Sequence, residues 1–111
     1  MAKYFSNTFL ALKVIFANQI YDVCQKMGID YDAVKEVASV SPRFAFSHFD
    51  VNFDGYRGYS GACLPKDTKA LIRFGDEIGV DLSLLKEADM INKKLLFSNK
   101  DISGDLLKLY Q

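Results

Sequence analysis

The strongest constraint on this chain is its first quarter, because residues 2–27 contain neither glycine nor proline. Apolar side chains recur there at helical spacing in two neighbouring stripes. We therefore predict a single helix over residues 2–27, ended by Gly28. The first stripe comprises Phe5, Phe9, Leu12, Phe16 and Ile20, and the second comprises Leu10, Val14, Ala17, Tyr21 and Cys24.

The length of this helix predicts a partner. At 1.5 Å per residue it would reach about 39 Å, which is longer than a domain of 111 residues is wide. A helix that is apolar on more than one face must bury each of those faces. One small domain cannot do so along the whole rod, and we expect a homodimer in which a second subunit lies against the first helix.

A second, shorter helix is expected between residue 30 and about residue 40. Asp30 or Asp32 can cap its start, and Ser41-Pro42 would end it. The side chains expected to face inward are Val34, Val37 and Ala38.

Two further helices are expected in the second half of the chain. The third follows Pro65, which suits a first helical turn, and ends at Gly75 or Gly79. The fourth begins near Asp81 or Ser83 and continues past residue 95. With no persuasive strand pattern, the fold class is all-α: a small helical domain built on one long N-terminal helix.

Residues 43–62 form a long loop rich in aromatic residues and glycine. Loops of this length inside a compact domain are usually functional or disordered, and the aromatic content favours order. The stretch from Asp50 to Gly55 also imitates the first half of a calcium-binding EF-hand loop. Its twelfth position is Gly61 rather than glutamate. We expect an Asx-rich turn, with a calcium-binding domain as a less favoured alternative.

Composition excludes several classes of protein. Fourteen basic and fourteen acidic residues cancel, which argues against a nucleic-acid-binding arm. No uncharged stretch approaches the roughly 20 residues of a membrane span, and no secretory leader is evident. We expect a cytoplasmic protein in which Cys24 and Cys63 are free thiols. His48 is the single histidine, so no metal site is expected.

The sharpest local feature is the segment from Gly61 to Asp67, with Cys63 beside the start of a helix and next to Lys66. The positive end of the helix dipole and a nearby cation both favour a thiolate, which is a nucleophile. The alternative is a structural cysteine. Cys24, in the middle of an apolar helix, is expected to belong to the core.

Lys3 and Asn7 stand four residues apart and share one face of the first helix. An ammonium and an amide donor are the groups wanted around an oxyanion. Solvated surface is the alternative for this pair.

Three segments together resemble a known family. KYFSNTFLALKVIFANQ, Pro42-Arg43 and GYSGACLPKDTKAL are similar, in order and spacing, to the central domain of the UDP-glucose/GDP-mannose dehydrogenases, which oxidise nucleotide sugars at C6. The similarity covers residues 2–97 and leans to UDP-glucose at Thr68 and Lys69. It implies a central, dimer-forming domain over 1–97, with 98–111 beginning a linker to a C-terminal domain.

The resemblance also implies the chemistry. The sugar C6 alcohol is oxidised to a carboxylate with two NAD⁺, and Cys63 matches the nucleophile that holds first a thiohemiacetal and then a thioester. Lys3 and Asn7 match the pair that stabilises the oxyanion. Asp67 matches the carboxylate that positions or activates the hydrolytic water.

The remaining assignments from the resemblance concern the substrate. Arg43 matches a residue that reaches the substrate of the neighbouring subunit, and His48 falls near the nucleotide phosphates. The backbone from Gly58 through Tyr59 to Gly61 would lie along the sugar. NAD would be bound by a domain absent from this chain, so the fragment alone is expected to be inactive. The alternative is a non-catalytic helical interaction module in which the cysteine is idle.

Overall fold

The computed structural model describes residues 1–45, 47–51, 57–98 and 110, so most of the expected linker over 98–111 lies outside the described residues. Within these ranges the chain forms four helices and no strand, which confirms the all-α class. The helices are α1 (Ala2–Met27), α2 (Tyr31–Ser39), α3 (Cys63–Ile78) and α4 (Ser83–Phe97).

The helix boundaries follow local backbone chemistry. Gly28 ends α1 in the left-handed conformation, with φ 70°, and its N–H meets the carbonyls of the last turn. Asp30 caps α2 by accepting a hydrogen bond from the backbone N–H of Asp32. Gly79 ends α3 with φ 79°. Cys63 begins α3, two residues before the predicted start at Pro65.

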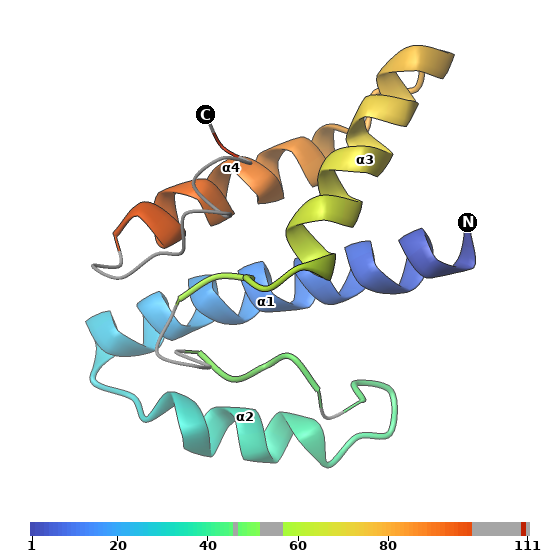
Figure 1. Ribbon diagram of the computed structural model, residues 1–111. Helices are drawn as coiled ribbons and strands as arrows, with labels where there is room; N and C mark the ends of the chain where they lie inside the picture. Colours follow the sequence, from blue (N-terminus) through green and yellow to red (C-terminus); the bar gives the residue numbers. More distant parts are fainter. Residues whose placement is uncertain (46, 52–56, 99–109, 111) are drawn as a thin grey trace.

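Helix α1 is the central rod of the domain (Figure 1). Helices α3 and α4 pack against it and against each other, whereas α2 contacts only α1 among the helices. Two groups of buried side chains hold these contacts. The first comprises Ala11, Val14, Ile15, Tyr59 and Ala88, and the second comprises Ala17, Cys24 and Tyr31.

The inward orientation predicted for one face of α2 is wrong. Val34, Val37 and Ala38 are all exposed. Only Tyr31 of this helix is buried. Among the helices α2 contacts only α1, and the segment that follows it meets α2 at Tyr31 and Lys35, through Phe49 and Asp50. Neither contact covers the valines.

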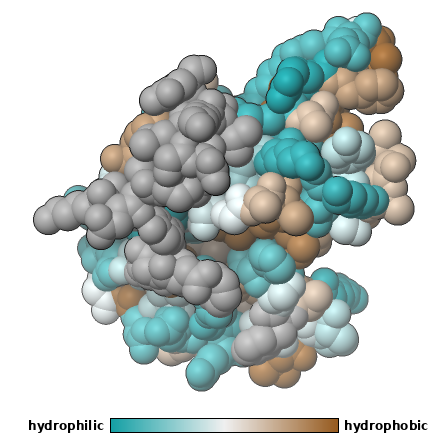
Figure 2. Space-filling view, in the orientation of Figure 1, coloured by the Kyte–Doolittle hydropathy of each residue, from teal (hydrophilic) through white to brown (hydrophobic). Residues whose placement is uncertain are grey.

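Part of the apolar surface of α1 is also exposed to solvent in the single chain. Phe5, Phe9 and Phe16 of the first predicted stripe are 73%, 56% and 61% exposed. The distal end of α3 projects from the domain (Figure 1), and apolar surface is visible there (Figure 2), where Ile78 is 57% exposed. Among the described residues, no helix is long and apolar enough to cross a membrane.

A buried hydroxyl in α3 allows a test of packing. Thr68 is fully buried, and its Oγ1 has no hydrogen-bond partner among the described residues. A buried polar group without a partner retains its desolvation penalty. We therefore expect Thr68→Val, which keeps the side-chain shape, to raise the free energy of unfolding by about 1 kcal/mol in urea titrations. A loss of stability of similar size would show that the hydroxyl is hydrogen-bonded in solution.

Candidate active site

Cys63 is the first residue of α3, and its side chain is exposed. The preceding residue, Ala62, is the N-cap and provides no side-chain cap for the helix. The first backbone N–H groups of a helix have no partner within the helix, and they carry its positive partial charge. The thiol therefore lies at the positive end of the helix dipole.

Cys63 lies on the wall of a pocket of about 550 Å³, a volume typical of sites for small molecules. Hydroxyl, imidazole, carboxylate and backbone groups line it together with a few apolar side chains. The lining residues are Val14, Ser47, His48, Asp50, Gly58, Tyr59, Ser60, Gly61, Ala62, Cys63 and Leu64.

Three of the predicted catalytic residues meet one turn further along α3. The Asn7 amide donates to Asp67 Oδ2 at 2.7 Å, and Lys3 Nζ lies 3.7 Å from the same oxygen. Asp67 follows Cys63 by four residues, so the two share a face of the helix. The structure thus brings Lys3, Asn7 and Asp67 together one helical turn from Cys63, and none of the three is among the residues that line its pocket. Asp67 is buried, whereas Lys3 is largely exposed.

The loop before α3 contains two glycines that have a left-handed backbone. Gly58 and Gly61 have φ values of 88° and 87°. A Cβ at Gly61 would meet no atom within 4 Å, so this position is open toward its surroundings. Tyr59, predicted to lie along the sugar, lines the pocket, but its ring is buried and its backbone N–H donates to Asn92. That N–H is therefore not available to a ligand.

His48 lies in the pocket wall, in a segment attached to α1 by a buried lysine. Lys13 Nζ donates to the carbonyls of Phe44 at 3.2 Å and Ala45 at 3.0 Å, and it lies 4.4 Å from the centre of the Phe49 ring. Burial lowers the pKa of Lys13. Desolvation, followed by the charge of Lys13, lowers the pKa of His48.

The lowered pKa of His48 predicts a dependence of stability on pH. Between the folded pKa and 6.5 the unfolded chain binds a proton that the folded chain does not, so stability is lost as pH falls through this window. We expect the His48 ring signals in NMR to titrate below pH 6.5, and His48→Gln to remove that part of the acid destabilisation. A midpoint at or above 6.5 would contradict the desolvation of this ring.

Other predicted residues lie apart from this arrangement. Arg43 is exposed in the turn after α2 and does not line the pocket. Of the EF-hand-like stretch, positions 52–55 lie outside the described residues, and the Asp50 carboxylate pairs with Lys35. The described residues contain no group of three or more side chains suited to hold a metal ion.

Comparisons with known proteins identify the family of this chain. The model of the UDP-glucose/GDP-mannose dehydrogenase family, central domain, matches residues 1–94. The chain belongs to this family. It is 37% identical over 92 residues to the UDP-glucose 6-dehydrogenase YwqF of Bacillus subtilis, covering 83% of this chain and 20% of that protein. It is 36% identical over 99 residues to the UDP-glucose 6-dehydrogenase of Pseudomonas aeruginosa, covering 86% and 21%.

A solved structure shares this central-domain fold. The UDP-glucose dehydrogenase of the hyperthermophilic archaeon Pyrobaculum islandicum superposes with a TM-score of 0.73 at 35% identity, over 84% of this chain and 21% of that one. The chain therefore spans about a fifth of the length of the relatives it matches.

The described part of this central domain does not fit a dinucleotide. A dinucleotide site places its glycine-rich turn between a strand and a helix. Gly58 and Gly61 instead lie in the short loop over 57–62 before α3, and the described residues form no strand. NAD is therefore not assigned to these residues.

Two residues that hold the pocket loop are not among those predicted from the sequence. Asn18 on α1 and Asn92 on α4 are almost completely buried. Asn18 accepts a hydrogen bond from the Arg57 side chain, and Asn92 accepts one from the Tyr59 backbone N–H. One signal was present in the sequence: Asn92 stands between Ala88 and Leu96 on the buried stripe of its helix. An amide on such a stripe requires a hydrogen-bonding partner.

Proposed function

We propose that this domain provides the nucleophilic cysteine of an NAD-dependent UDP-sugar 6-dehydrogenase acting on UDP-glucose. The observation that carries the proposal is the exposed Cys63 thiol in a pocket at the uncapped start of α3, with the Lys3–Asn7–Asp67 cluster one helical turn away. The names of the relatives support the substrate class.

Each residue then has a chemical role in the proposal. The Cys63 thiolate adds to C6 of the sugar aldehyde, forming the S–C6 bond and leaving the negative charge on oxygen. Asn7 and Lys3 stabilise that oxygen. Loss of a hydride from C6 gives the thioester. Water, positioned by Asp67, then breaks the S–C6 bond and releases carboxylate and thiol. Both hydrides removed from C6 would go to NAD held outside the described residues.

The remaining residues of the site would bind the substrate, and the domain would form a homodimer. His48 and the Gly58–Gly61 backbone line the pocket and would contact the phosphates and the sugar, and Arg43 would reach the partner's substrate. The uncovered face of α1 supports a homodimer. A cytoplasmic setting would keep the Cys63 thiol reduced.

Protection from alkylation tests this assignment. In a dehydrogenase that carries this domain, we expect iodoacetamide to modify Cys63 and not the buried Cys24, and millimolar UDP-glucose to slow the modification of Cys63 at least tenfold. UMP, which lacks the sugar, should protect much less. Modification of Cys63 at the same rate with and without UDP-glucose would favour the non-catalytic interaction module instead.

A further inference from the structure

The loop that forms one wall of the Cys63 pocket is held from two sides. Toward α1, the Arg57 guanidinium donates to Asn18 Oδ1 at 3.0 Å and to Asp22 Oδ1 at 2.9 Å, and it lies over the Tyr21 ring. Toward α4, the Asn92 amide binds both backbone groups of Tyr59. It accepts from the Tyr59 N–H at 2.7 Å and donates to the Tyr59 carbonyl at 3.0 Å.

The contact with α4 leaves no spare space. Asn92 is completely buried, and a Cβ built on Gly58 would lie 2.5 Å from Asn92 Oδ1. Gly58 also has a backbone φ of 88°, which residues other than glycine rarely adopt. The fit between Gly58 and Asn92 therefore fixes the path of the loop where it enters the pocket wall.

A second layer of hydrogen bonds fixes Asn92 and the Tyr59 ring. The hydroxyls of Tyr59 and Tyr110 both donate to Asp89 Oδ1, at 2.7 and 2.8 Å, and the Asn92 amide donates to the Tyr110 hydroxyl at 2.9 Å. Lys69 donates to Asp89 Oδ2 at 2.8 Å and lies 4.0 Å from the centre of the Tyr110 ring. We call Tyr59, Lys69, Asp89, Asn92 and Tyr110 the Tyr59 clamp.

The donors and acceptors of the Tyr59 clamp are paired with one another. Burial raises the pKa of both tyrosines, so their hydroxyls remain donors at neutral pH. The Asp89 carboxylate is buried, but it accepts from two hydroxyls and one ammonium, which offsets the cost of removing it from water. A satisfied network of this kind specifies one arrangement of the backbone it holds.

We propose that Asn92 is a positioning residue for the Cys63 pocket, and that Tyr110, near the end of the chain, completes the hydrogen bonds that hold Asn92 in place. The loop from Gly58 to Gly61 is thereby set before ligand binds, and its order depends on whether Tyr110 is docked on α4. This role rests on the proposed function, because the loop matters to catalysis only if the pocket holds the sugar.

Amide hydrogen exchange of the 111-residue chain, followed by NMR, tests the clamp itself. We expect Asn92→Ala to accelerate exchange of the Tyr59 amide at least tenfold, and Tyr110→Phe, which keeps the ring and removes only the hydroxyl, to accelerate it about fivefold. The amide of Ile15 in α1 should change less than twofold. Tyr21→Phe, the same chemical change on the Arg57 side, should alter neither amide.

Two outcomes would contradict the role proposed for the Tyr59 clamp. Either Tyr59 exchange is unchanged in both variants, or it accelerates no more than that of Ile15, which would indicate general destabilisation. If Asn92→Ala does not fold, Tyr110→Phe decides alone.

Steady-state kinetics tests the link to the site. In a dehydrogenase carrying this domain, Asn92→Ala should raise the KM for UDP-glucose at least fivefold and lower kcat less than twofold. A reduced fraction of folded enzyme would instead lower kcat and leave KM unchanged, and that result would contradict a positioning role. Because neither Cys63 nor its protection by UDP-glucose enters the exchange experiment, failure of the proposed function and failure of the clamp remain distinguishable.

Discussion

In a dehydrogenase that carries this domain, Cys63→Ser is expected to lower the rate of acid formation by at least about 10³-fold, because the covalent route is lost. A serine hydroxyl is not ionised at neutral pH and is a much weaker nucleophile than a thiolate, so neither the covalent adduct nor the acyl intermediate should accumulate. The measurement is release of UDP-glucuronate, followed by chromatography. The exposed position of Cys63 predicts that folding stability changes by less than about 0.5 kcal/mol.

The second cysteine provides the matched control. Cys24 is buried in the cluster formed with Ala17 and Tyr31. Cys24→Ala should lower the free energy of unfolding by about 1 kcal/mol through the lost packing, and it should leave acid formation near its original rate. Acid formation by Cys63→Ser at the rate of the unmodified enzyme would remove Cys63 from the mechanism.

The helices could be predicted from the sequence because their signals are local. Gly28 and Gly79 end helices in the left-handed conformation, and Asp30 caps one. Each acts within a few residues of itself. The start of α3 was placed two residues late because Pro65 marks a first turn without specifying which position of that turn it occupies.

The tertiary pairings required more than local signals. Asn7 and Asp67 are separated by 60 residues, and nothing in the spacing of either predicts their hydrogen bond. Only the resemblance to the dehydrogenase family placed them in one site. The valines of α2 show the opposite failure: periodicity indicated an apolar face, but the packing of the helices leaves that face uncovered.

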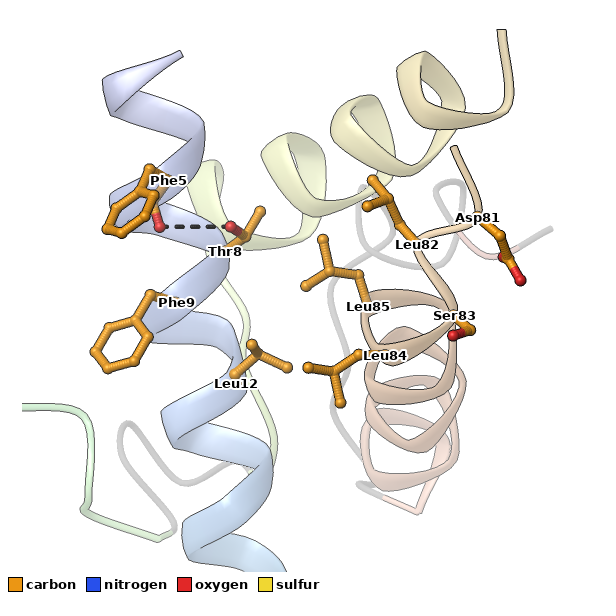
Figure 3. A pocket seen from close by; sticks show the side chains of 9 residues that line it. All are labelled: Phe5, Thr8, Phe9, Leu12, Asp81, Leu82, Ser83, Leu84 and Leu85. Atoms are coloured by element: carbon orange, nitrogen blue, oxygen red, sulfur yellow. Dashed lines mark hydrogen bonds between the residues drawn. The ribbon is translucent and has the colours of Figure 1, made fainter. Parts of the chain in front are cut away.

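Helix α1 presents an apolar face that the single chain does not cover. Figure 3 shows the rings of Phe5 and Phe9 pointing away from α4, whereas Leu12 and Thr8 turn toward it. Between the first part of α1 and the start of α4 lies a second pocket of about 370 Å³, lined mostly by apolar side chains. In a twofold dimer the same face of both subunits forms the interface, so the interface would bury two copies of each exposed phenylalanine, one from each subunit.

We therefore expect the chain to sediment as a dimer at tens of micromolar, and Phe9→Glu to convert it to a monomer. Leaving a phenylalanine unburied costs about 2 kcal/mol, so two copies cost about 4 kcal/mol, or roughly 10³-fold in the dimer dissociation constant. Ile78→Glu is the matched control, because Ile78 is 57% exposed against 56% for Phe9 but lies at the far end of α3. This variant should remain a dimer. If the unmodified chain sediments as a monomer, or if both variants dissociate equally, the uncovered face of α1 is not the dimer interface.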